Sequence, residues 1–247
     1  MPHLESIIFV AAVFLLAGWV KGVVGLGLPT VAMGALGLIM PPVQAAALLV
    51  IPSLVTNIWQ FATGPAKLPI VRRLTSMMLF VCLGTALGIS FLTGPSRWPS
   101  AALGAVLVLY ALLALYLPRL TVPARLEPPL SPAVGFTTGL LTGATGVFVV
   151  PAVPYLSALG FNKDELVQAL GLSFTVSTIA LAVALGSTNS LSARTLLASL
   201  GAVIPALLGM FVGQRTRNRI DPVVFRRWFF TAMLLVGGYM VLRGLAM

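Results

Sequence analysis

A glycine-interrupted apolar segment occurs twice in this chain, once in each half. Residues 18–29 read GWVKGVVGLGLP, and residues 135–151 read GFTTGLLTGATGVFVVP. Each glycine inside a helix costs about 1 kcal/mol relative to alanine. We therefore expect a broken backbone in both segments. In membrane proteins, paired interruptions at corresponding positions of two halves point to a binding site.

The composition excludes a water-soluble domain. The chain is 59% hydrophobic and 8% charged, whereas soluble domains carry about 25% charged residues. Apolar runs near bilayer-spanning length recur along the sequence, which predicts an all-α, polytopic transmembrane helix bundle. The run that begins at Leu4 lacks a basic start and a cleavage site, so we interpret it as a retained span. The single Cys82 excludes an intramolecular disulfide and is expected to be a buried small apolar residue.

A proline-rich stretch from Leu117 to Pro132 divides the chain nearly in half, and we expect it to be non-helical. A second repeated motif follows each glycine segment: Val43-Gln44-Ala45 in one half and Val167-Gln168-Ala169 in the other. The two glutamines open their helices as capping or pathway residues. These features predict an N-terminal repeat (1–117), a linker (118–132) and a C-terminal repeat (133–247).

The first part of the chain looks hairpin-like. As helices, Glu5 to Lys21 would extend about 25 Å and Leu28 to Met40 about 20 Å, both short for a full crossing. Further helices are predicted over residues 43–63, 70–92, 98–117, 163–186, 191–213 and 222–245.

Basic residues predict the orientation of the two halves. The net charge is +10, and most Lys and Arg residues lie in short loops, which the positive-inside rule places in the cytoplasm. The residues expected inside are Lys67, Arg72, Arg73, Arg119, Arg125, Lys163, Arg215, Arg217, Arg219, Arg226 and Arg227, leaving Arg97, Arg194 and Arg243 outside. This distribution requires five segments in each half. An odd number inverts the second half, so we predict a 5+5 inverted repeat with both termini periplasmic.

The breaks after Gly27 and Gly146 are each expected to expose the N-terminus of a short helix. Unpaired backbone N–H groups and the helix dipole favour anions there. Two inverted copies would bring these ends together near the midplane, with hydroxyl donors from Thr142 and Thr145. The alternative is close helix packing, because several glycines recur four residues apart. Those glycines are Gly18 and Gly22 in the first copy and Gly135, Gly139 and Gly143 in the second.

Polar side chains extend this candidate site. Lys21 lies beside the first break and is either a buried functional cation or a residue that snorkels to the interface. Ser53, Asn57 and Gln60 share one face of their helix. Ser173 and Ser177 share a face of the matching helix, and Thr175 and Thr178 lie nearby. These groups either line a substrate path or make interhelical hydrogen bonds.

The positions of the acidic residues and of the histidine, and the motifs that the chain lacks, argue against other classes of protein. All five acids fall at or near segment ends: Glu5, Glu127, Asp164, Glu165 and Asp221. The only histidine is His3, so an internal proton relay has no obvious carrier. No metal-ligand cluster, phosphate-binding loop, dinucleotide fingerprint or catalytic constellation is present. We therefore expect no enzyme activity, no cofactor, no metal and no nucleic-acid partner.

The doubled glycine motif, each copy followed by a polar-lined helix, resembles the TauE/SafE sulfite exporter (toluene-sulfonate uptake permease) family. The resemblance covers essentially the whole chain, including the proline-rich divider and the segment Val55-Thr-Asn-Ile-Trp-Gln60. The chain departs from the family's triple-glycine pattern, since Leu28-Pro29 follows Gly27 and Ala144-Thr145 interrupts the second copy.

The resemblance implies transport of small sulfur-containing anions, such as sulfite, sulfoacetate or other organosulfonates, across a bacterial inner membrane. The expected substrate-binding residues are Lys21, Gly25, Gly27, Ser53, Asn57, Gln60, Gly143, Thr145, Gly146, Ser173 and Ser177. The alternatives are a transporter of another small solute and a non-transporting membrane assembly subunit. The sequence leaves open a homo-oligomer.

Overall fold

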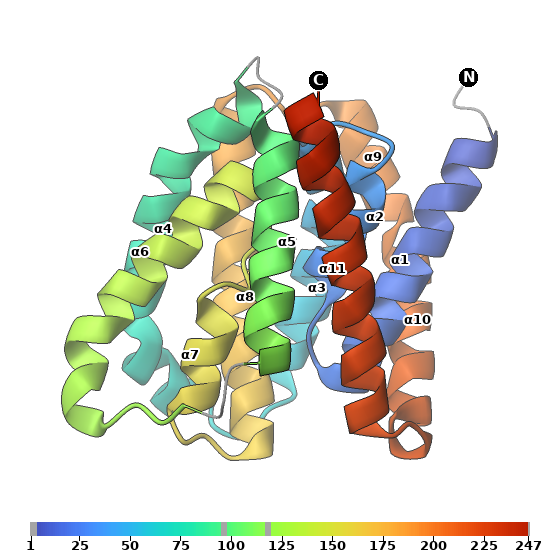
Figure 1. The fold of residues 1–247 in the computed structure, drawn as a ribbon. Helices are drawn as coiled ribbons and strands as arrows, with labels where there is room; N and C mark the ends of the chain where they lie inside the picture. Colours follow the sequence, from blue (N-terminus) through green and yellow to red (C-terminus); the bar gives the residue numbers. More distant parts are fainter. Residues whose placement is uncertain (1–3, 95–97, 117–119, 247) are drawn as a thin grey trace.

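A computed structural model describes residues 4–94, 98–116 and 120–246, and this part of the chain is built from helices (Figure 1). The first half contains α1 (Leu4–Val24), α2 (Leu28–Gly37), α3 (Pro42–Ala62), α4 (Lys67–Thr93) and α5 (Trp98–Tyr116). The second half contains α6 (Glu127–Thr145), α7 (Ala152–Ala158), α8 (Lys163–Ser187), α9 (Ala193–Gly201), α10 (Val203–Thr216) and α11 (Pro222–Ala246). Short 3-10 turns cover Ala124–Leu126 and Arg217–Arg219.

Within the described residues, seven segments are long and apolar enough to cross a membrane. They correspond to α1, α3, α4, α5, α8, the α9–α10 pair and α11. The predicted polytopic helical bundle is therefore confirmed. In each half a short helix follows a glycine break, α2 after the first and α7 after the second.

The expectation that both parts of the first glycine element are short is wrong for α1. This helix has 21 residues and therefore extends about 31 Å, enough to cross the hydrocarbon layer. It continues beyond Lys21 to Val24, because a single charge does not end a helix whose remaining residues are apolar. The 10 residues of α2 extend only about 15 Å.

The proline-rich divider is shorter than predicted. Residues 120–123 are non-helical, but α6 begins at Glu127 and contains Pro128, Pro129 and Pro132. Pro128 and Pro129 lie in the first turn, where the missing N–H would have no intrahelical partner. Pro132 lies inside the helix, where it removes one intrahelical hydrogen bond without ending the helix. The expectation of a non-helical linker up to Pro132 is therefore wrong from Glu127 onwards.

Several helix pairs join the first half of the chain to the second, and four are the most extensive. They are α1 with α10, α4 with α6, α5 with α11, and α3 with α8. Glycines bring the backbones together: a Cβ on Gly139 of α6 would lie 2.8 Å from the Thr85 nitrogen of α4, and a Cβ on Gly22 of α1 would lie 2.8 Å from the Gln214 nitrogen of α10. The packing role proposed for the glycines spaced by four is therefore confirmed.

Cys82 lies on an exposed face of α4, so the expectation that it is buried is wrong. On a membrane helix an apolar side chain gains little from facing the protein rather than the lipid, so apolar character does not predict burial there.

The basic residues gather at one end of the bundle. The loops that precede α4 and α11 lie at the lower end in Figure 1, whereas α1 begins and α11 ends at the upper end. Arg73 of α4 forms a two-pronged ion pair with Glu127, with N–O distances of 2.7 Å, and donates to the carbonyl of Leu159. We call this lower region, made of residues 62–67, 120–126, 159–163 and 217–221, the basic end. Four of the residues named above lie outside the described part of the chain: His3, Arg97, Leu117 and Arg119.

Candidate functional site

Both predicted helix breaks are present, and each contains glycine in a backbone conformation that other residues rarely adopt. Gly25 and Gly27 have φ angles of 79° and 111°, and Gly146 has a φ of 75°. The positive φ ends the preceding helix without steric strain because glycine has no Cβ. Leu26 and Gly27 separate Gly25 from α2, whereas residues 147–151 separate Gly146 from α7. The second connector is therefore longer than the first.

The two breaks do not face each other. The carbonyl of Gly25 accepts a hydrogen bond from Gln60, near the end of α3, whereas a Cβ on Gly146 would touch Ala46, near its start. These two levels of α3 are about 21 Å apart at 1.5 Å per residue. The two glycine breaks therefore lie at different depths, and the helices that follow them begin at Leu28 and at Ala152. That their N-termini face one anion stays a prediction. The longer second connector and the seven residues of α7 explain why the second break does not repeat the first.

Lys21 is buried in the interior, with 3% of its surface exposed. Its ammonium group donates to the Thr56 hydroxyl at 3.1 Å and to the side-chain oxygen of Asn57. Of the two interpretations of this lysine, the snorkelling one is therefore wrong. The side chain leaves α1 and contacts the second half of α3.

A chain of hydrogen bonds continues from this lysine to α8. The Asn57 side-chain amide donates to the Ser53 hydroxyl at 3.0 Å and to the Thr178 hydroxyl at 3.4 Å. The two hydroxyls are 3.3 Å apart. We call Lys21, Ser53, Thr56, Asn57 and Thr178 the Lys21 cluster. It joins the last turn of α1, the second half of α3 and the middle of α8.

The charge of Lys21 has no acidic partner in the described part of the chain. The ion pair found there joins Arg73 to Glu127 at the basic end. The five acids begin or precede helices, as expected. An uncompensated buried cation is costly, and neutral oxygens only partly replace its lost hydration. An ammonium group has three N–H donors, and two of those of Lys21 have protein partners.

Several buried polar atoms also lack a partner. The Ser173 and Ser177 hydroxyls on α8 and the side-chain oxygen of Gln60 have none, and neither does the Thr138 hydroxyl. Buried polar groups in folded proteins are nearly always hydrogen-bonded. Unpartnered hydroxyls one turn apart on α8, the helix that also carries Thr178 of the Lys21 cluster, are therefore candidates for ligand contacts.

The remaining predicted site residues are placed elsewhere. Gly143 packs against the α4 backbone, where a Cβ would lie 2.8 Å from the nitrogen of Ile89. The Thr145 hydroxyl donates to the carbonyl of Leu141 within its own helix. Gly27 precedes α2, and its carbonyl accepts from the Thr30 hydroxyl. Within the described residues, no hydrogen bond joins these residues to the Lys21 cluster, whereas Gly25 lies close to it through Gln60.

Sequence reasoning missed Thr56 and gave Thr178 no role of its own. Thr56 follows Ser53 by one turn and precedes Asn57, so its position on the polar face of α3 was a usable signal. The expectation that Gln168 opens its helix is wrong, because α8 begins at Lys163 and its N-cap is Asn162. The Gln168 side chain instead accepts from the backbone N–H of Ala66 and donates to the carbonyl of Phe61, which links α8 to the connection between α3 and α4. Gln44 is exposed, so the glutamines of the repeated Val-Gln-Ala motif differ in environment.

No group of three or more His, Cys, Asp or Glu side chains suited to a metal ion occurs among the residues described. The site is instead a buried cation with neutral hydrogen-bonding groups, enclosed by membrane-spanning helices. This combination defines a polytopic membrane protein with an interior suited to an anion.

A family model described as sulfite exporter TauE/SafE matches residues 10–240. The chain therefore belongs to the TauE/SafE sulfite exporter family, and membership implies a membrane transporter of sulfur-containing anions. Neither the search of curated proteins nor the search of solved structures returned a match.

Proposed function

We propose that this protein is a secondary transporter or facilitator that moves small sulfur-containing anions, such as sulfite, sulfoacetate or another organosulfonate, across a bacterial inner membrane. The observation that carries the proposal is the buried Lys21 ammonium, which has no acidic partner in the described residues. An anion bound beside it neutralises the charge and accepts its remaining N–H. In this proposal the Lys21 cluster replaces the opposed helix ends as the centre of the site.

The neutral groups around Lys21 suit the oxygens of a sulfite or sulfonate group. Ser173 and Ser177 offer O–H donors that have no protein partner. Asn57 and Thr56 hold the ammonium in place through direct hydrogen bonds. Hydrogen bonds between charged and neutral groups are stronger than neutral pairs, and they need no internal acid that would repel the substrate.

We also propose that the two halves form a 5+5 inverted repeat. The packing pattern supports it: exchanging the halves converts the α1–α10 contact into the α6–α4 contact, and it maps the α3–α8 and α5–α11 pairs onto themselves. In each half the short helix after the glycine break is the second of five segments. Inverted repeats of this kind allow alternating access, because one set of helices can move against the other.

The electrical potential supports export as the favoured direction. With the cytoplasm negative, an outward-moving anion gains about 2.3 kcal/mol per charge per 100 mV. Export therefore requires no coupled proton, which agrees with the absence of buried carboxylates from the described membrane segments.

We expect the basic end to be cytoplasmic and both termini periplasmic, by the positive-inside rule. In a Cys82→Ser background, a Thr188→Cys variant should react with an impermeant maleimide in intact cells. An Ala124→Cys variant should react only after permeabilisation. Both positions are exposed, and they lie at opposite ends of the bundle. The reverse labelling pattern would invert the proposed orientation.

Removing polar groups from α3 and α8 is expected to slow transport. In proteoliposomes, Asn57→Leu should reduce sulfite flux at least tenfold, because Lys21 loses its amide partner. Ser177→Leu should do the same by removing a buried hydroxyl donor. The matched controls Ile58→Leu and Ile179→Leu alter exposed positions beside each residue and should retain wild-type flux. Unchanged flux in both polar variants would remove these positions from the site.

A further inference from the structure

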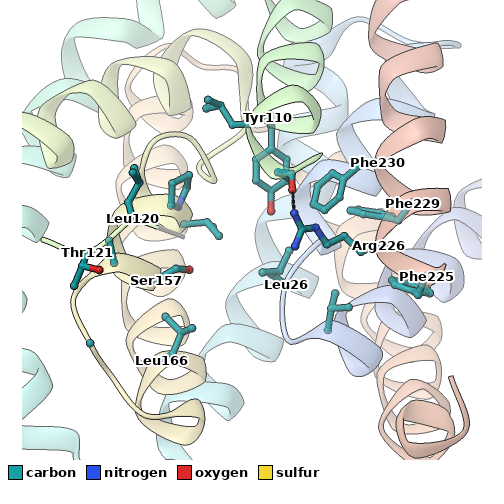
Figure 2. Close-up of a pocket in the computed structure, with 17 residues that line it drawn as sticks. Leu26, Tyr110, Leu120, Thr121, Ser157, Leu166, Phe225, Arg226, Phe229 and Phe230 are labelled. Carbon is teal, nitrogen blue, oxygen red and sulfur yellow. Dashed lines mark hydrogen bonds between the residues drawn. The ribbon is translucent and has the colours of Figure 1, made fainter. Parts of the chain in front are cut away.

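A cavity of about 740 Å³ opens at the basic end, beside the first glycine break. The break contributes Leu26, and α7 contributes Val153. Figure 2 shows Tyr110 and the start of α11 on one side, with Thr121, Ser157 and Leu166 on the other. No residue of the Lys21 cluster lines this cavity, so it is a separate feature of the fold.

One wall of the cavity is a cluster of aromatic rings. The ring centroids of Tyr110 and Phe230 are 5.2 Å apart in an edge-to-face arrangement, and those of Phe229 and Phe230 are 4.9 Å apart. Phe225 stacks on Phe229 at 6.0 Å. Such a wall gains free energy by covering an apolar group and gains nothing from a small, fully hydrated ion.

Arg226 is the charged residue in the cavity lining (Figure 2). One guanidinium nitrogen donates to the carbonyl of Ala114 at the end of α5, which fixes the head of the side chain at the cavity edge. A guanidinium has five N–H donors, so its remaining N–H groups are available to bind an acid group. Hydroxyls of Thr121 and Ser157 lie across the cavity from it.

The inner wall of the cavity adjoins the Lys21 cluster. Val24 lines the cavity and lies one turn after Lys21 on α1. Behind this wall, the Gln60 amide donates to the carbonyl of Gly25 at 2.9 Å and to that of Val167 at 2.8 Å. Gln60 therefore links the backbone of the glycine break to the backbone of α8. It lies one turn along α3 from the Lys21 cluster.

We propose that this cavity is the entry site for an organic anion with an apolar substituent. Its acid group contacts Arg226, and its apolar part lies on the rings of Tyr110, Phe229 and Phe230. The anion then passes Gln60 to reach Lys21. A bare oxyanion would leave the aromatic wall uncovered, whereas an organic anion uses both the charge and the rings. This inference rests on the proposed function and specifies its substrate class.

The test measures binding to the full-length protein in lipid nanodiscs by isothermal titration calorimetry. Cyclohexanesulfonate should bind at least tenfold more tightly than methanesulfonate, which carries the same acid group. Cyclohexylammonium, with the opposite charge, should not bind. Arg226→Gln should weaken cyclohexanesulfonate binding at least fivefold, whereas Arg227→Gln, an exposed neighbour outside the cavity lining, should leave it within twofold.

A second variant tests the volume of the cavity without altering its charge. Ser157→Trp places a large ring in the space and should abolish cyclohexanesulfonate binding. Equal affinities for the two sulfonates, or equal effects of the two arginine variants, would overturn the inference. Sulfite flux in proteoliposomes separates the two proposals. Flux that depends on Lys21 with no cavity binding removes only the cavity inference, and cavity binding with no flux of any anion removes the transport proposal.

Discussion

Replacing Lys21 with methionine is expected to abolish sulfite transport while the protein remains folded. Methionine keeps an unbranched apolar chain as far as Cε but lacks the charged ammonium group. Losing one partner of a buried charge contact costs about 2–5 kcal/mol, which corresponds to at least about a thirtyfold loss of substrate binding. Stability should change little, because replacing a buried ion with an apolar residue is often neutral or stabilising. Sulfite efflux from proteoliposomes and thermal unfolding in nanodiscs measure the two effects.

The matched control is Lys67→Met, which removes one positive charge from an exposed position at the basic end. It should leave both flux and melting temperature close to wild type. Lys21→Arg separates charge from geometry: the larger planar head keeps the charge but does not fit the contacts to Thr56 and Asn57, so we expect partial flux. Wild-type sulfite flux in Lys21→Met would refute the proposed site.

The second large effect is expected where the two halves of the chain touch. Gly139→Ala should destabilise the protein by about 3 kcal/mol, the upper part of the range for overpacking, because the added Cβ meets the α4 backbone. No rotamer change relieves that clash. Gly238→Ala makes the same substitution inside α11, where a Cβ meets nothing within 4 Å, and it should stabilise the helix by about 0.5–1 kcal/mol.

Thermal unfolding in the same nanodiscs compares the two alanine variants directly. We expect the melting temperature to fall for Gly139→Ala and to stay constant or rise for Gly238→Ala. If both variants changed the melting temperature equally, the close α4–α6 contact would not be a determinant of stability.

Long apolar runs and glycine breaks were predictable from the sequence because they depend on local physics. The predicted helices over 43–63 and 163–186 agree closely with α3 and α8. Gly25, Gly27 and Gly146 were identified as break positions because a broken apolar helix needs residues that tolerate positive φ. The start of α6 was misplaced, since proline was treated as a helix breaker where the first turn accepts it.

The site was only partly predictable because it depends on which helices meet. Lys21, Ser53 and Asn57 were singled out individually, but the sequence does not state that α1 brings its lysine against the second half of α3. The relative depth of the two glycine breaks was not predictable for a similar reason. Their depth in the bundle depends on connector length, and residues 147–151 form a longer connector than the one before α2.

The pairing of α1 with α10 has a consequence for how the protein is made. The ribosome completes α1 first and α10 almost last, so α1 enters the membrane long before its partner exists. The glycine face of α1 must therefore meet lipid or the insertion machinery until nearly the whole chain has been synthesised. The partner of α4, α6, is likewise synthesised later, so neither half has its complete set of partners alone. Assembly is finished only when the second half has packed against the first.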